Sequence, residues 1–74
     1  MIPESETDRT WSALQAALEA ERRVQDEMDQ ILRDSADRGQ AERRILEDSA
    51  PKMDAALARS REALRAFKRA VEKR

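Results

Sequence analysis

MDAALARSREALRAFKRAV, residues 53–71, is the most regular stretch of this 74-residue sequence, and it decides the fold. Its seam residues recur at alternating intervals of four and three: Met53, Leu57, Ser60, Leu64, Phe67 and Val71. This heptad spacing is typical of a helix that packs lengthwise against another helix. Leu46 and Ala50 continue the same register toward the N-terminus. The stretch therefore predicts a coiled-coil-like C-terminal helix over residues 51–73.

The first half of the chain carries a second amphipathic pattern. Its large apolar residues recur at helical intervals: Trp11, Leu14, Leu18, Val24, Met28, Ile31 and Leu32. Such a stripe predicts a helix with one apolar side, placed at residues 7–36. Ser5 and Asp8 have the spacing of a capping box, which marks the helix start. Residues 1–6 are predicted to be a flexible N-terminus.

Two breaks divide the helical pattern. Gly39, the only glycine, lies in a short polar stretch and is expected to end the first helix as a left-handed C′ residue, within a turn at residues 37–40. A short helix is expected at residues 41–49, before Pro51, which fits the first turn of a new helix. Either Pro51 only kinks one long second arm, or it separates two helices. We favour an all-α, single-domain antiparallel hairpin with a kink or short break at Pro51.

Composition excludes several other classes of protein. Charged residues make up 42% of the chain and aromatic residues 3%, with only two valines and three isoleucines to form strands. No apolar run approaches the roughly 18 residues of a membrane span, and the first residues are acidic rather than basic and apolar, so we expect a cytoplasmic protein.

Catalytic and metal-binding chemistry also lacks the usual residues. The chain contains no histidine and no cysteine, so we expect no enzyme activity, no cofactor and no structural zinc. Arginines interrupt the acidic cluster of the first arm, which lacks the glycine and the spacing of a calcium loop. Its members are Glu19, Glu21, Asp26, Glu27 and Asp29. We interpret this cluster as a solvated helix face.

Charge is divided unevenly along the chain. Residues 1–50 carry 7 basic and 13 acidic side chains, a net charge of −6, whereas residues 51–74 carry 8 basic and 3 acidic side chains, a net charge of +5. Opposite charge favours antiparallel pairing of the two arms, and it favours pairing between chains equally well.

A hairpin gives each helix only one neighbour, so we expect the apolar seams to be covered by a second chain in a helical bundle. The sequence thus predicts a non-catalytic protein-interaction module, of an adaptor, chaperone-like or regulatory kind, that self-associates or binds a partner helix. The predicted partner-binding residues are Trp11, Leu14, Leu18, Met28, Leu32, Leu57, Leu64, Phe67 and Val71.

Three seam positions allow more than one interpretation. Trp11 is expected to pack on the far arm, and the alternative is an exposed anchor for a partner. Glu21 and Ser60 occupy positions where the seam pattern would place apolar residues. Such residues usually lie at a wet edge, although they can also fix the register of a coiled coil.

The C-terminal helix is also basic. Its candidate anion-binding residues are Arg59, Arg61, Arg65, Lys68 and Arg69. A basic amphipathic helix can bind nucleic acid, an anionic membrane surface or an acidic partner, or its charges can simply keep the helix solvated. Nucleic-acid binding is therefore the alternative function, although the stretch has no interleaved aromatic residues and no DNA-reading motif.

In organisation, the chain is similar to the small helical-hairpin chaperones that hold needle subunits in type III secretion. The similarity covers the length, the Glu- and Arg-rich first arm, the polar turn around Gly39 and the apolar second arm. It includes no diagnostic motif, so it assigns no residue a role. Dimeric RNA-binding bundles and secreted paired-helix proteins match equally well, but the Trp-x-Gly turn of the latter is missing, because Ser12 and Ala13 follow Trp11.

Overall fold

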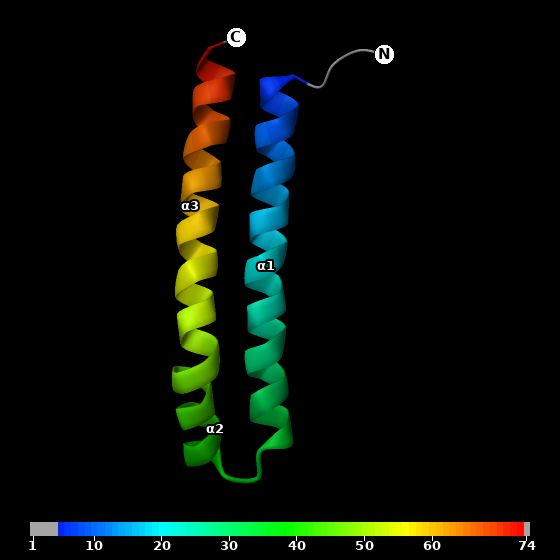
Figure 1. The fold of residues 1–74 in the computed structure, drawn as a ribbon. Coiled ribbons are helices and arrows are strands. Elements are labelled where there is room, and N and C mark those ends of the chain that lie inside the picture. Colours follow the sequence, from blue (N-terminus) through cyan, green and yellow to red (C-terminus); the bar gives the residue numbers. More distant parts are fainter. Residues whose placement is uncertain (1–4, 74) are drawn as a thin grey trace.

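The computed structural model describes residues 5–73, and it shows a hairpin of two antiparallel helical arms (Figure 1). Helix α1, Glu6–Asp34, is the first arm; α2, Arg38–Arg44, a π-helical turn, Ile45–Ser49, and α3, Ala50–Glu72, together form the second. The start of α1 and the end of α3 lie at the same end of the hairpin, with the turn at the other (Figure 1). The prediction of an all-α hairpin is therefore confirmed.

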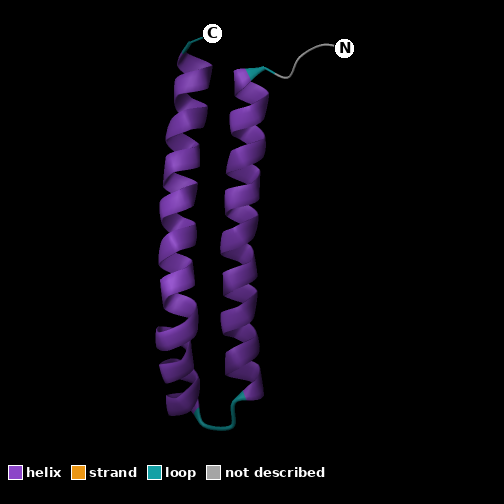
Figure 2. Ribbon diagram, in the orientation of Figure 1, coloured by secondary structure: helices purple, strands orange, loops and turns teal. Residues whose placement is uncertain are grey.

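Helix and short loops account for the whole of residues 5–73, with no strand among them (Figure 2). The hairpin measures 53 × 22 × 12 Å, so it is only one helix thick. No helix within these residues is long and apolar enough to cross a membrane.

Helix α1 begins with the side-chain cap that its sequence indicates. The Ser5 Oγ accepts a hydrogen bond of 3.1 Å from the Asp8 backbone N–H, which satisfies one of the free donors of the first turn. Glu6 and Asp8 place negative charge at the positive end of the helix dipole. Of the predicted flexible N-terminus, Ser5 is the cap and Glu6 is already helical, while residues 1–4 lie outside the described residues.

The reversal between the arms differs from the prediction. Gly39 lies inside α2 and does not have a positive φ, so its predicted role as a left-handed C′ residue is wrong. Helix α1 ends at Asp34, and Ser35 and Asp37 both adopt extended backbone conformations that turn the chain. The Asp37 carboxylate accepts a hydrogen bond of 2.9 Å from the Gly39 N–H and caps α2, so the turn comprises residues 35–37 rather than 37–40.

Pro51 lies in the first turn of α3 without breaking the second arm. Directly before it, the Ala50 N–H donates to the carbonyl of Ile45, five residues back instead of four. In a regular α-helix the proline ring would collide with the carbonyl four residues back, and the wider π turn relieves that collision. The predicted separate helix at residues 41–49 is thus α2 and the π turn, continuous with α3.

Small side chains dominate the contact between the arms. On the second arm, Ala56, Ser60 and Ala70 are buried, and Met53, Ala63 and Phe67 are half-buried between them. On α1, the buried side chains are those of Leu14, Ala17 and Ile31. The seam of the second arm therefore includes Met53, Ser60 and Phe67, as the sequence predicted, but Ala56, Ala63 and Ala70 take the places predicted for Leu57, Leu64 and Val71. Alanine allows two helices to approach more closely than leucine does, and the leucines are displaced to the side.

Candidate interaction surface

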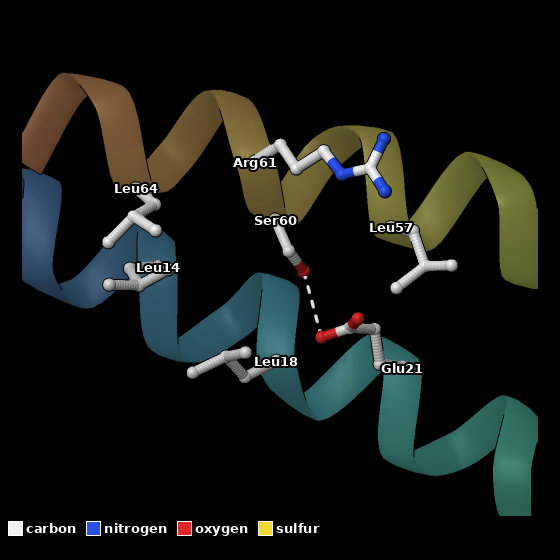
Figure 3. Close-up of a pocket in the computed structure, with 7 residues that line it drawn as sticks. All are labelled: Leu14, Leu18, Glu21, Leu57, Ser60, Arg61 and Leu64. Atoms are coloured by element: carbon white, nitrogen blue, oxygen red, sulfur yellow. Dashed lines mark hydrogen bonds between the residues drawn. The ribbon is translucent and has the colours of Figure 1, made fainter.

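One side of the hairpin carries large apolar residues next to the seam. We call this surface the apolar face; its residues are Trp11, Leu18 and Leu32 on α1, with Leu57, Leu64 and Val71 on α3. Within each helix these residues are spaced by seven or a multiple of seven, so they form one row per helix. Leu18, Leu57 and Leu64 line a shared groove of about 340 Å³, which places the two rows on the same side (Figure 3).

The apolar face is largely open to solvent. Leu18 is 49% exposed, Trp11 46% and Leu64 41%. Outside this face, Leu46 is the other large exposed apolar residue among those described, and it lies in the π turn. The exposed Gln25 separates Leu32 from the other apolar residues of the α1 row. A group of neighbouring apolar residues such as Leu18, Leu57 and Leu64 marks an interaction site more often than scattered single residues do.

The predicted partner-binding set divides between this face and the seam. Leu14 is buried, and Met28 and Phe67 are half-buried, so these three pack between the arms. The remaining members lie on the apolar face. Trp11 packs on the far arm and is also exposed, so both interpretations of this residue apply in part. Its ring centroid lies 5.3 Å from that of Phe67, at an interplanar angle of 49°, and 46% of the residue is exposed.

A polar contact forms part of the floor of the groove. The Ser60 Oγ donates a hydrogen bond of 3.0 Å to the Glu21 Oε2, linking α3 to α1 (Figure 3). Ser60 is buried, and Glu21 is half-buried. Each of the two polar seam residues therefore provides the other with a hydrogen-bond partner. A shifted alignment of the arms would leave both without this partner, so the hydrogen bond favours the observed alignment.

The opposite side of the seam is charged. We call it the charged face; it carries the ion pairs Glu27 with Lys52, at 2.9 Å, and Glu6 with Lys73, at 4.0 Å. Between these pairs lie Ala13 and Ala20 on α1, and Arg59 and Ala66 on α3. A second hollow, whose lining includes Ala20, Lys52 and Arg59, lies on this side. The ion pairs were not predicted, although the 21-residue spacing of both Glu6 with Glu27 and Lys52 with Lys73, three heptads, was visible in the sequence.

The candidate anion-binding residues do not form one cluster. All five are exposed, but Arg61 lines the groove of the apolar face, whereas Arg59 lines the hollow on the charged face. Arg61, Arg65 and Lys68 follow one side of α3 at intervals of four and three. Arg59 and Arg69 lie away from that stripe. In Figure 3 the Arg61 side chain extends along α3 toward Leu57.

The acidic residues of α1 are similarly dispersed. Glu19, Asp26 and Asp29 are exposed, Glu27 pairs with Lys52, and Glu21 accepts from Ser60. Across residues 5–73, no group of three or more acidic side chains is placed to hold a metal ion. Chemically, the surface offers apolar area with a charged border.

Comparison with protein-family models, with curated proteins and with solved structures found no match to this chain.

Proposed function

We propose that this chain is a non-catalytic protein-interaction module whose apolar face binds helices of another chain. The observation that carries the proposal is the exposure of Leu18, Leu57 and Leu64 around one groove. Burial of a leucine side chain is worth about 1.5–3 kcal/mol, so covering this face would supply a substantial binding free energy. An amphipathic helix in such a groove would present its own apolar residues at intervals of three and four.

The elongated shape of the hairpin leaves enough surface for an interface. The chain exposes 6067 Å², whereas a compact monomer of 8.5 kDa exposes about 4,700 Å². The excess is about 1,400 Å². Stable protein interfaces bury roughly 800 Å² on each partner, so the excess is large enough for one such interface.

The groove offers little for catalysis. Its polar groups are the Glu21 carboxylate, the Ser60 hydroxyl and the Arg61 guanidinium. An activated serine needs a base that is itself oriented by a third group, and here the hydroxyl is hydrogen-bonded to a carboxylate from the opposite arm. We therefore propose binding rather than turnover as the role of this surface.

A photo-crosslinking experiment tests this function. A benzoylphenylalanine introduced at Leu18, on the apolar face, is compared in the native cell with the same residue at Ala13, which is exposed on the charged face. We expect protein adducts from position 18 and few from position 13, with the crosslinked peptide identified by mass spectrometry. Equal yields from the two positions would contradict the proposal.

A second candidate function is binding of an anionic polymer or surface by α3. It is favoured by Arg61, Arg65 and Lys68, which share one side of the helix and form no ion pair within residues 5–73. This function predicts binding to nucleic acid or anionic vesicles that weakens steeply with salt and is lost in the variant Arg61→Glu with Arg65→Glu. Absence of binding by the wild-type protein at low salt would eliminate it.

A further inference from the structure

We propose that the apolar face binds a second copy of this chain, and that the two copies lie in parallel with their turns at the same end, α1 of each over α3 of the other. The inference rests on the proposed function, because it names the occupant of the same face. It adds the identity of the partner, its orientation and the charged residues that select it.

The width of the apolar face indicates a hairpin rather than a single helix as the occupant. Apolar residues line it from both arms, Leu18 on α1 and Leu57 and Leu64 on α3. One helix would cover one row and leave part of the other in water. A second copy of the hairpin has the same two rows, so the two faces cover each other over the segment that carries Trp11 and Leu18 on α1 and Leu57, Leu64 and Val71 on α3.

The contacts within one chain fix which residues of the two arms lie at the same level. Trp11 contacts Phe67, Glu27 pairs with Lys52, and Glu6 pairs with Lys73. By the same antiparallel register, Leu18 lies between the levels of Leu57 and Leu64. A two-fold axis along the hairpin leaves these levels unchanged, so each apolar row of α1 meets the apolar row of the partner's α3 without any shift.

The charged borders of the apolar face are complementary in this arrangement. Along the outer edge of its α1 row lie Asp8, Gln15 and Arg22, and along the outer edge of its α3 row lie Lys68, Arg61 and Asp54. The register places Asp8 two to three residues, about 3–4.5 Å along the axis, from the level of Lys68, and it places Arg22 equally far from the level of Asp54 and the uncharged Gln15 from that of Arg61. Across the two-fold axis, the border residue nearest in level to Asp8 and to Arg22 therefore carries the opposite charge, at an offset that the long side chains of Lys68 and Arg22 can span.

These border residues have no equivalent partners within one chain. Asp8, Arg22, Asp54 and Lys68 are exposed, and none of them forms an ion pair within residues 5–73. The two edges of one apolar face are separated by both apolar rows, so a pair between them requires a second copy. This matching of border residues does not extend to the end of the hairpin near the turn. There the π turn adds one residue to the second arm, and the residues before it no longer follow the heptad positions of α3.

The opposite orientation of the second copy is disfavoured. It would place α1 over α1 and α3 over α3. The acidic α1, with 8 acidic and 4 basic side chains, would then lie against the same helix of the other chain, and the basic α3, with 6 basic and 3 acidic side chains, against itself. Like-charge contacts across an interface disfavour a partner arrangement even where salt bridges add little affinity.

Site-specific crosslinking tests the arrangement, and the chain is suited to it because it contains no cysteine. In the full-length double variant Arg22→Cys with Asp54→Cys, a short bismaleimide should join two chains into a covalent dimer. The single variants Arg22→Cys and Asp54→Cys should give little dimer, since each cysteine then faces Asp54 or Arg22 of the second copy. A dimer from Arg22→Cys alone would overturn the proposal in favour of the opposite orientation.

Charge exchange provides a second test that does not depend on the crosslinker. We expect Arg22→Asp to weaken dimerisation by about tenfold in sedimentation equilibrium, because both copies lose an attraction and gain a repulsion. Asp54→Arg should act likewise, and the double variant R22D/D54R should restore wild-type affinity. A wild-type chain that stays monomeric, or an exchange that does not restore dimerisation, would overturn the proposal.

The outcomes distinguish this inference from the function on which it rests. If the protein is monomeric but benzoylphenylalanine at Leu18 crosslinks to a different protein, the apolar face binds helices and the second copy is not its occupant. If position 18 gives no more adduct than position 13, the proposed function itself fails.

Discussion

The two faces that flank the seam have equivalent geometry and different chemistry. Both are rows adjacent to the same heptad positions, and both run the length of the hairpin. The charged face places Glu27 against Lys52, with alanines and Arg59 between its two ion pairs, whereas the apolar face places Leu18 beside Leu57 and Leu64. A hairpin that functioned alone would gain from charged residues on both sides. The asymmetry is the basis of our proposal that one side meets solvent and the other meets protein.

The largest expected effect follows from making the two faces alike. In the variant Leu18→Glu with Leu64→Glu, four negative charges would be brought into each dimer interface, and association should be lost at micromolar concentrations in sedimentation experiments. Helical content by circular dichroism should fall with it, because a two-helix hairpin alone has a small core. The matched control, Ala13→Glu with Ala66→Glu on the charged face, should retain association. Equal behaviour of the two variants would show that the faces are equivalent.

The sequence was sufficient to predict the hairpin, but only part of its seam: Met53, Ser60 and Phe67 lie there as predicted. The heptad spacing predicted the helix carried by residues 53–71, and the helix formed as expected. The same stretch contains two neighbouring rows, Leu57 with Leu64 and Ala56 with Ala63, which differ by one residue along the chain. Hydrophobicity alone favours the leucine row, whereas the structure uses the alanine row. Close approach of two helices depends on side-chain size, which a count of apolar residues does not include.

The turn was located to within a few residues, but its chemistry was misassigned. A lone glycine is the most frequent left-handed helix terminator, and Gly39 was assigned that role. The alternative was present in the sequence, because Asp37 is a strong N-cap residue two positions before it. Nor could the sequence choose between a kink and a break at Pro51, since the π turn that resolves the question has no sequence signature. The sequence also could not predict the apolar face, because the packing of the two arms decides which rows of side chains are exposed to solvent.

The next largest effect concerns the polar contact on the floor of the apolar face. Replacement of Glu21 by Ala leaves the buried Ser60 hydroxyl without an acceptor, and we expect a loss of about 1–2 kcal/mol of stability. This corresponds to a fall in melting temperature of about 4–8 °C per kcal/mol for a domain of this size. Glu21→Gln keeps an acceptor oxygen and should lose less than half as much. A melting temperature unchanged by Glu21→Ala would show that the contact contributes nothing to alignment.

A smaller effect of opposite sign is expected within the seam, away from both faces. Ser49, in the π turn, is 0% exposed, and its hydroxyl has no hydrogen-bond partner among the described residues. Ser49→Ala removes this buried polar group and introduces a residue of higher helix propensity. We therefore expect the free energy of unfolding, measured by urea denaturation, to rise by about 1 kcal/mol. Ser12→Ala, on the exposed surface of α1, controls for helix propensity. Destabilisation by Ser49→Ala beyond this control would mean that the hydroxyl has a partner in solution.

The smallest effect tests the other side of the comparison, the ion pairs of the charged face. Glu27 and Lys52 approach to 2.9 Å, but both side chains are partly exposed, and pairs of this kind contribute about 0.2–1 kcal/mol. Urea is the appropriate denaturant, because it does not screen charge. A double-mutant cycle of Glu27→Gln and Lys52→Gln should give a coupling free energy below about 0.5 kcal/mol at low salt, and close to zero at about 1 M salt, where the screening length is roughly 3 Å. A larger, salt-insensitive coupling would mean that this pair is protected from solvent. The charged face would then also be covered by protein, and the distinction between the two faces would no longer hold.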